Sequence, residues 1–189
     1  MLPSAVNALE ANTLLAAFAA LPFAAALVWA LATARIRRGR PARAAWRDSI
    51  AEVGAVVGSI PLLFLGLTPR DGAAAVQLVP FVDLADLAEA APRVIVEQLV
   101  GNLLILAAAG FFLPIRFRLG LGRIAVGAAM ACIAIETIQY TFVGGRVVSV
   151  DDAMLNTLGA VLAALASRRW WRVRSPDGET HAVAGALGR

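Results

Sequence analysis

Residues 133–159 read IAIETIQYTFVGGRVVSVDDAMLNTLG, two apolar segments joined by a short turn that carries an Arg. Glu136 lies inside the first segment, and Asp151 and Asp152 lie at the start of the second. A charged side chain at the centre of a bilayer costs about 2.5–3.5 kcal/mol on insertion scales, so such residues are rare and usually functional. We therefore expect the functional site at the junction of these two segments.

The composition of the whole chain indicates an integral membrane protein. Of its 189 residues, 60% are hydrophobic and 16% are charged, whereas soluble domains are usually about 45–50% apolar and about 25% charged. The single Cys excludes an intramolecular disulfide, and the single His, His181, lies in a polar tail. The motifs of P-loop, dinucleotide-binding, zinc-protease and serine-hydrolase sites are missing from the sequence. We therefore expect no metal and no cofactor.

Five apolar segments are long enough to cross a bilayer, which takes about 20 residues in a helix. Only helices close their backbone hydrogen bonds within one segment, so all five are predicted to be helical. The sequence thus predicts an all-α integral membrane bundle of about five transmembrane helices, with residues 1–189 in one multi-pass domain and a disordered cytoplasmic tail at 168–189. The expected spans are 12–34, 50–68, 94–114, 124–143 and 147–166.

The Arg residues predict how the bundle is oriented in the cell membrane. Fourteen of the 17 Arg residues lie in loop 35–47, loop 115–123 and the C-terminal tail, which five alternating spans place on one side. Because cytoplasmic loops are rich in Arg, we expect an external N-terminus and a cytoplasmic C-terminus. The N-terminus lacks a basic region, which argues against a cleaved signal peptide. These short Arg clusters flank apolar spans and do not indicate a nucleic-acid partner.

This topology brings polar residues of the last three spans to one depth near the outer surface. Gln98 also belongs to this layer, four residues before Asn102 and on the same helical face. Arg146 lies on the short external turn, where its guanidinium would suit a phosphate. The side chains expected to form a polar binding pocket are Asn102, Glu136, Gln139, Arg146, Asp152 and Asn156.

The acidic residues at the turn also have a structural interpretation. Ser149 is three residues before Asp152, as in a capping box, which would explain Asp151 or Asp152 as part of a helix N-terminus. Arg146 could pair with either Asp residue and fix the turn.

The buried amides and Glu136 have structural interpretations too. Asn102 and Asn156 could hydrogen-bond one helix to another, which is typically worth about 0.6 kcal/mol. Glu136 lies inside an apolar span, so capping of a helix end cannot explain its presence. Its structural interpretation is a protonated acid that is hydrogen-bonded to Gln98 or Asn102.

Small residues predict where helices approach one another closely. Gly54 and Gly58 form one such motif in the second span, and Gly159 with Ala163 forms another in the last span. Segment 79–82 is apolar and is expected to be a re-entrant or interfacial segment over the polar layer.

A series of short motifs resembles the VanZ-like family, which is named for a teicoplanin-resistance accessory protein. The motifs are VPF at 79–81, GNLLIL at 101–106, GFFLP at 110–114, ETIQ at 136–139, GR at 145–146 and DDAMLNTLG at 151–159. The resemblance covers residues 76–167 and implies a multi-pass membrane protein linked to lower susceptibility to teicoplanin-type glycopeptides. Family members often carry a further acid where this chain has Ser149.

Two kinds of function fit these residues. In the first, the pocket binds membrane lipids, a lipid-linked envelope precursor or a lipoglycopeptide at the outer leaflet, without catalysis. In the second, the protein is a membrane-embedded enzyme that acts on a polyprenyl- or glyco-lipid, with Glu136 and Asp151 or Asp152 as acid and base. A homo-oligomer that completes the site fits either function. Five spans without a clear repeat argue against a secondary transporter.

Overall fold

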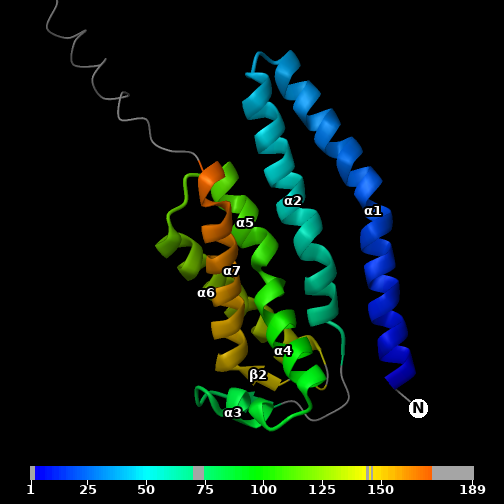
Figure 1. Ribbon diagram of the computed structural model, residues 1–189, viewed down its shortest axis with the longest axis vertical. Helices are drawn as coiled ribbons and strands as arrows, with labels where there is room; N and C mark the ends of the chain where they lie inside the picture. The colour runs from blue at the N-terminus through cyan, green and yellow to red at the C-terminus, as the bar shows by residue number, and fades with distance from the viewer. Residues whose placement is uncertain (1–2, 70–74, 144, 146, 172–189) are drawn as a thin grey trace, which may run out of the picture.

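The computed structural model describes residues 3–69, 75–143, 145 and 147–171. Five helical segments of this part are long and apolar enough to cross a membrane, which confirms the predicted all-α membrane bundle (Figure 1). The elements are α1 (Pro3–Arg37), α2 (Ala42–Gly66), β1 (Ala75–Gln77), α3 (Val82–Ala88), α4 (Pro92–Ile105), α5 (Ala107–Arg116), α6 (Leu121–Phe142), β2 (Val147–Ser149), α7 (Val150–Ser167) and the 3-10 helix η1 (Arg168–Trp170).

Helix α7 lies at the centre of the packing because small residues let it approach α4 and α5 backbone to backbone. A Cβ atom at Gly159 would lie 1.9 Å from the backbone oxygen of Leu103, and one at Gly110 would lie 2.2 Å from that of Ala160. Both positions therefore require glycine. The predicted small-residue face is present at Gly159, but its next fully buried residues are Ala160 and Ala164, whereas Ala163 is only partly buried.

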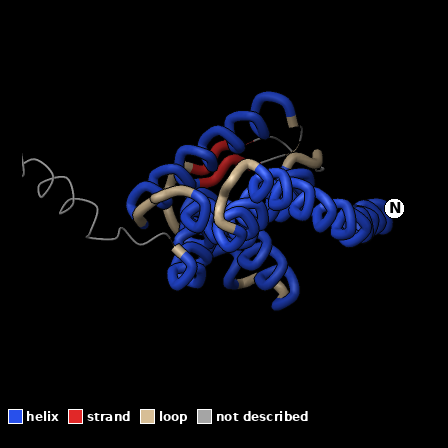
Figure 2. The backbone as a smooth tube through the Cα atoms, turned by 90° about the horizontal axis from the view of Figure 1, so that it is seen from above, coloured by secondary structure: helices blue, strands red, loops and turns tan. Residues whose placement is uncertain are grey.

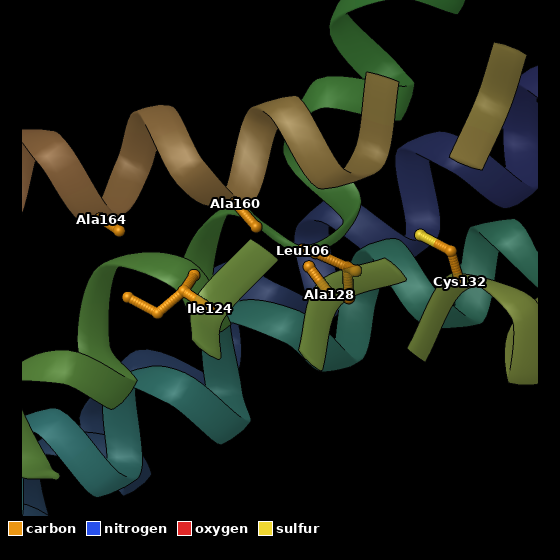
Figure 3. Close-up of a cluster of buried hydrophobic side chains, with 6 residues drawn as sticks. All are labelled: Leu106, Ile124, Ala128, Cys132, Ala160 and Ala164. Atoms are coloured by element: carbon orange, nitrogen blue, oxygen red, sulfur yellow. The ribbon is translucent and has the colours of Figure 1, made fainter. Parts of the chain in front are cut away.

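The apolar core follows the same helix. Figure 3 shows Ala160 and Ala164 of α7 facing Ile124, Ala128 and the end of α4. The buried cluster consists of Leu106, Ile124, Ala128, Cys132, Ala160 and Ala164.

The third span is two helices rather than the single helix that we expected over 94–114. Leu106, with φ −105° and ψ 5°, lies between α4 and α5. The break falls between Leu103 and Gly110, the two positions where the backbone of α7 comes closest. Each half can therefore adjust its own contact with α7.

The second span packs on α5 through its predicted glycine motif. A Cβ atom at Gly54 would lie 2.6 Å from the Phe112 ring, and one at Gly58 would lie 2.7 Å from the Cβ atom of Ala108. Helix α1 lies beside α2 at the edge of the bundle (Figure 1).

Two short strands pair at one end of the bundle, which the sequence analysis did not predict. Strands β1 and β2 are parallel, with Ala75 opposite Val147 and Gln77 opposite Ser149. Figure 2, a view along the bundle, shows the strands lying between helices. The last span was expected from residue 147, but its first three residues form β2. Segment 79–82 leads from β1 into the short helix α3.

Ion pairs join α1, α2 and α5 at the opposite end, where the Arg-rich loops lie. Glu52 of α2 binds Arg35 of α1 at 2.5 Å and also binds Arg116 of α5. The fully buried carboxylate of Asp48 lies 3.3 Å from Arg40 and 3.6 Å from Arg47. Some of the Arg residues that predicted the orientation thus also hold helices together.

Replacing Gly159 tests the close approach of α7. Because a Cβ atom would clash with backbone, Gly159→Ala should lower the free energy of unfolding by about 1–3 kcal/mol. Gly127→Ala is the matched control, since nothing lies within 4 Å of its added Cβ atom; it should be neutral or stabilise by up to about 1 kcal/mol. Thermal unfolding in detergent would measure both, and equal stability of the two variants would contradict this packing.

Candidate functional site

Polar residues of α4 and α7 meet at the strand end of the bundle. The side-chain amide of Asn102 donates a hydrogen bond to Oδ1 of Asp152. Two of the six residues predicted for the pocket are therefore brought together, across the same helix pair that touches at Gly159. This bond also matches the helix-to-helix role considered for Asn102.

Asp152 borders two neighbouring cavities of about 400 Å³ each. The first lies between α2 and α4 and includes Glu97, Gln98 and Asn102. The second lies under α3 and includes Asp83, Asp86 and Ser149. Because the cavities share Val94, Gln98 and Asp152, they form one polar region, which we call the polar chamber.

Asp151 holds α3 in place over this chamber. Its buried carboxylate accepts hydrogen bonds from the backbone N–H groups of Phe81 at 2.6 Å and Leu84 at 3.1 Å. Phe81 has φ 68°, a left-handed conformation that residues other than glycine rarely adopt. Asp151 thus stabilises both a helix N-terminus and an unfavourable backbone conformation, and each of its carboxylate oxygens already accepts a hydrogen bond within the fold.

Ser149 caps α7, as its position in the sequence suggested. Its hydroxyl oxygen accepts from the Asp151 N–H at 3.1 Å, while the hydroxyl donates to Oδ2 of Asp83. Where the resemblance led us to expect a further acid, this chain therefore has a hydroxyl bonded to an acid from α3.

Glu136 lies on the other side of α7 from the chamber. It borders a groove of about 880 Å³ between α6 and α7, whose other lining residues are mostly apolar. Its Oε1 atom is buried and has no hydrogen-bond partner in the described part of the chain. The sequence-based interpretation that Glu136 forms a hydrogen bond with Asn102 is wrong, because the side-chain amide of Asn102 donates to Asp152 instead.

The register of α6 and α7 places Glu136 opposite Asp152. Cys132 lies beside Asn156 and Thr157. One turn further along each antiparallel helix, the carboxyl groups of Glu136 and Asp152 are close enough to interact electrostatically. Glu136 thus lines the groove at the level where Asp152 lines the chamber.

The remaining predicted pocket residues do not join this pair in one cluster. Gln139 is buried and donates a hydrogen bond to the Gly66 carbonyl at 2.8 Å, which ties α6 to the end of α2. Asn156 is buried between helices, and its Oδ1 atom has no hydrogen-bond partner among the described residues. Arg146 lies outside the described residues, so its pairing and its role in binding phosphate stay predictions.

Within the described ranges, no three His, Cys, Asp or Glu side chains come together as metal ligands would. The groove itself was missed by sequence reasoning. Its apolar lining has the same composition as any lipid-facing helix surface, and only the packing of α6 against α7 shows which faces form it.

The fold and site define a multi-pass helical membrane protein with a polar chamber and an apolar groove at one end. The family model of VanZ/LLP1 matches residues 40–172, and the chain belongs to this family. The match begins before α2, earlier than the 76–167 core suggested by the motifs, and leaves all of α1 outside. No curated protein and no solved structure gives a significant match to the chain.

Removing the Asp151 carboxylate tests how α3 is held. In Asp151→Ala, the N–H groups of Phe81 and Leu84 lose their acceptor, so their hydrogen exchange should accelerate by about tenfold or more, since such a bond is worth about 1.5–3 kcal/mol. Hydrogen-exchange mass spectrometry of peptides from this region would measure the change. Glu89→Gln, at the exposed end of α3, is the control. Unchanged exchange in Asp151→Ala would refute this role.

Proposed function

We propose that this VanZ-family membrane protein binds a lipid-linked component of the cell envelope at the outer leaflet and thereby lowers susceptibility to teicoplanin-type glycopeptides. The observation that supports this most is that Glu136, on the apolar groove, lies at the level of Asp152, which borders the polar chamber on the other side of α7. An amphiphile needs these two environments side by side, one for its chain and one for its head group.

The chamber can hold a polar head group through several side chains. Asp152 and Asn102 lie on its wall, and Gln98 borders both of its cavities. Carboxylates and amides together accept and donate hydrogen bonds, which suits a head group rich in hydroxyl or amide groups. Helix α3 and its carboxylates Asp83 and Asp86 close the chamber on one side.

The distribution of Arg residues supports an outward-facing chamber. In the described part of the chain, the strand end carries Arg93, whereas the opposite end carries the two Arg-rich loops and η1. By the positive-inside rule, this asymmetry supports an outward-facing strand end and an external N-terminus. The residues at the opposite end are Arg35, Arg37, Arg38, Arg40, Arg43, Arg47, Arg116, Arg118, Arg123, Arg168 and Arg169.

An enzyme acting on a polyprenyl- or glyco-lipid is the second candidate. The observation that favours it is that Glu136 and Asp152 interact electrostatically, because paired carboxyl groups can serve as general acid and base. Asp151 suits this role less, since its carboxylate binds two backbone N–H groups.

Glycopeptide susceptibility of a sensitive Gram-positive host tests the first proposal. Cells expressing the wild type should tolerate more teicoplanin but no more vancomycin, because only teicoplanin carries an acyl chain. Glu136→Gln and Asp152→Asn should remove the gain, since Glu136 lines the groove and Asp152 borders the chamber. The minimal inhibitory concentrations of both antibiotics are measured at matched membrane levels of protein.

Glu89→Gln is the matched control, because Glu89 is exposed at the end of α3 and lines neither the groove nor the chamber. A maleimide that cannot cross membranes should label Leu78→Cys in intact cells, in a Cys132→Ala background, if the strand end is outside.

Wild-type protein that is well expressed and changes the susceptibility to neither teicoplanin nor vancomycin would contradict the proposal. Lipid turnover that Glu136→Gln abolishes while lipid binding persists would favour the enzyme.

A further inference from the structure

The groove between α6 and α7 has the length of a lipid chain in one leaflet. Its α6 wall extends from Ala129 to Tyr140, and its α7 wall from Val150 to Val161. At about 1.5 Å per residue, each wall is about 16 Å long, close to half of a hydrocarbon core about 30 Å thick. A chain that entered from the strand end would reach the middle of the bilayer.

The polar side chains that line the groove are few: Glu136, Thr137, Tyr140 and Thr157. Glu136 is the one charged residue among the described residues that line it. The hydroxyl of Thr137 donates to the Ile133 carbonyl at 2.6 Å and is thus engaged within its own helix. Glu136 is therefore the lining group that selects against a negatively charged ligand group.

The Glu136 carboxyl needs a hydrogen-bond donor. Its Oε1 atom is buried without a partner in the described part of the chain, although about 90% or more of buried polar groups have one. A ligand O–H or N–H at this depth would supply the missing bond. A phosphate would instead place a second anion beside Glu136, and no described residue of the groove is basic.

Apolar side chains of the strands line the outer end of the groove. Val76 and Leu78 come from β1 and the residues after it, and Val148 comes from β2. An ionic group among these side chains would lose part of its hydration without gaining a counter-charge from the described lining residues, which costs more than placing a single hydroxyl or amide there.

From these contacts we infer that the groove binds a single apolar chain whose first polar group is an uncharged hydrogen-bond donor, a hydroxyl or an amide N–H, that donates to Glu136. The inference rests on the proposed function and specifies its ligand. Free alcohols and N-acylated or N-alkylated head groups share this chemistry, and phosphate monoesters are excluded from the groove.

Native mass spectrometry of the full-length protein in detergent tests this selectivity with three ligands of equal chain length. Dodecanol and N-dodecylacetamide represent the two donors, and dodecyl phosphate is the anionic alternative. Each donor should bind about tenfold more tightly than the phosphate, a difference of about 1.4 kcal/mol. If one of the two donors binds more strongly than the other, this difference identifies the preferred polar group of the ligand as a hydroxyl or as an amide. Glu136→Leu should remove the preference while binding of the chain remains.

Two further variants locate the site. Ala129→Phe fills the groove and should abolish binding of all three ligands, whereas Ala134→Phe, on another face of the same helix that is exposed and does not line the groove, should not. Equal or tighter binding of dodecyl phosphate, or a preference that survives Glu136→Leu, would overturn the inference and leave the proposed lipid binding intact. Binding of none of the ligands would overturn the proposed function as well.

Discussion

The contact of α7 with α4 and α5 is the constraint on which the other features depend. A Cβ atom added at Gly159 or at Gly110 would lie within 2.2 Å of a backbone oxygen, so the helices touch main chain to main chain. In a bilayer, helices associate through such close packing and interhelical hydrogen bonds, because burial of apolar surface gives little driving force there. This contact fixes the rotation of α7 and thereby assigns each of its polar residues to one side.

The same rotation separates two environments. Asp152 faces α4, where Asn102 donates to it, and the apolar residues of the other face of α7 form the groove with α6. Glu136 lines the groove from α6 and keeps a buried oxygen without a described partner. Asp151 and Ser149, at the start of α7, attach α3 over the chamber. One helix thus positions the polar chamber, its cover and the groove.

Features that depend on local sequence could be predicted, and features that depend on distant contacts could not. Apolar length gave the five spans, and the position of Ser149 gave the cap of α7. The pairing of β1 with β2 joins segments about 70 residues apart and leaves no local pattern. The break at Leu106 likewise depends on where α7 crosses. Helical periodicity placed Glu136 and Gln139 on one face but could not show that Gln139 would bind Gly66 while Glu136 borders a groove.

The pairing of Asn102 with Asp152 tests the central claim most directly, because it exists only if α7 meets α4 in this rotation and register. A double-mutant cycle would compare the free energies of unfolding of Asn102→Ala, Asp152→Ala and the double variant in detergent. The structure predicts a favourable coupling of about 0.6–1.7 kcal/mol, as found for hydrogen bonds between membrane helices. Additive effects, with no coupling, would contradict the packing of α7 and the site that depends on it.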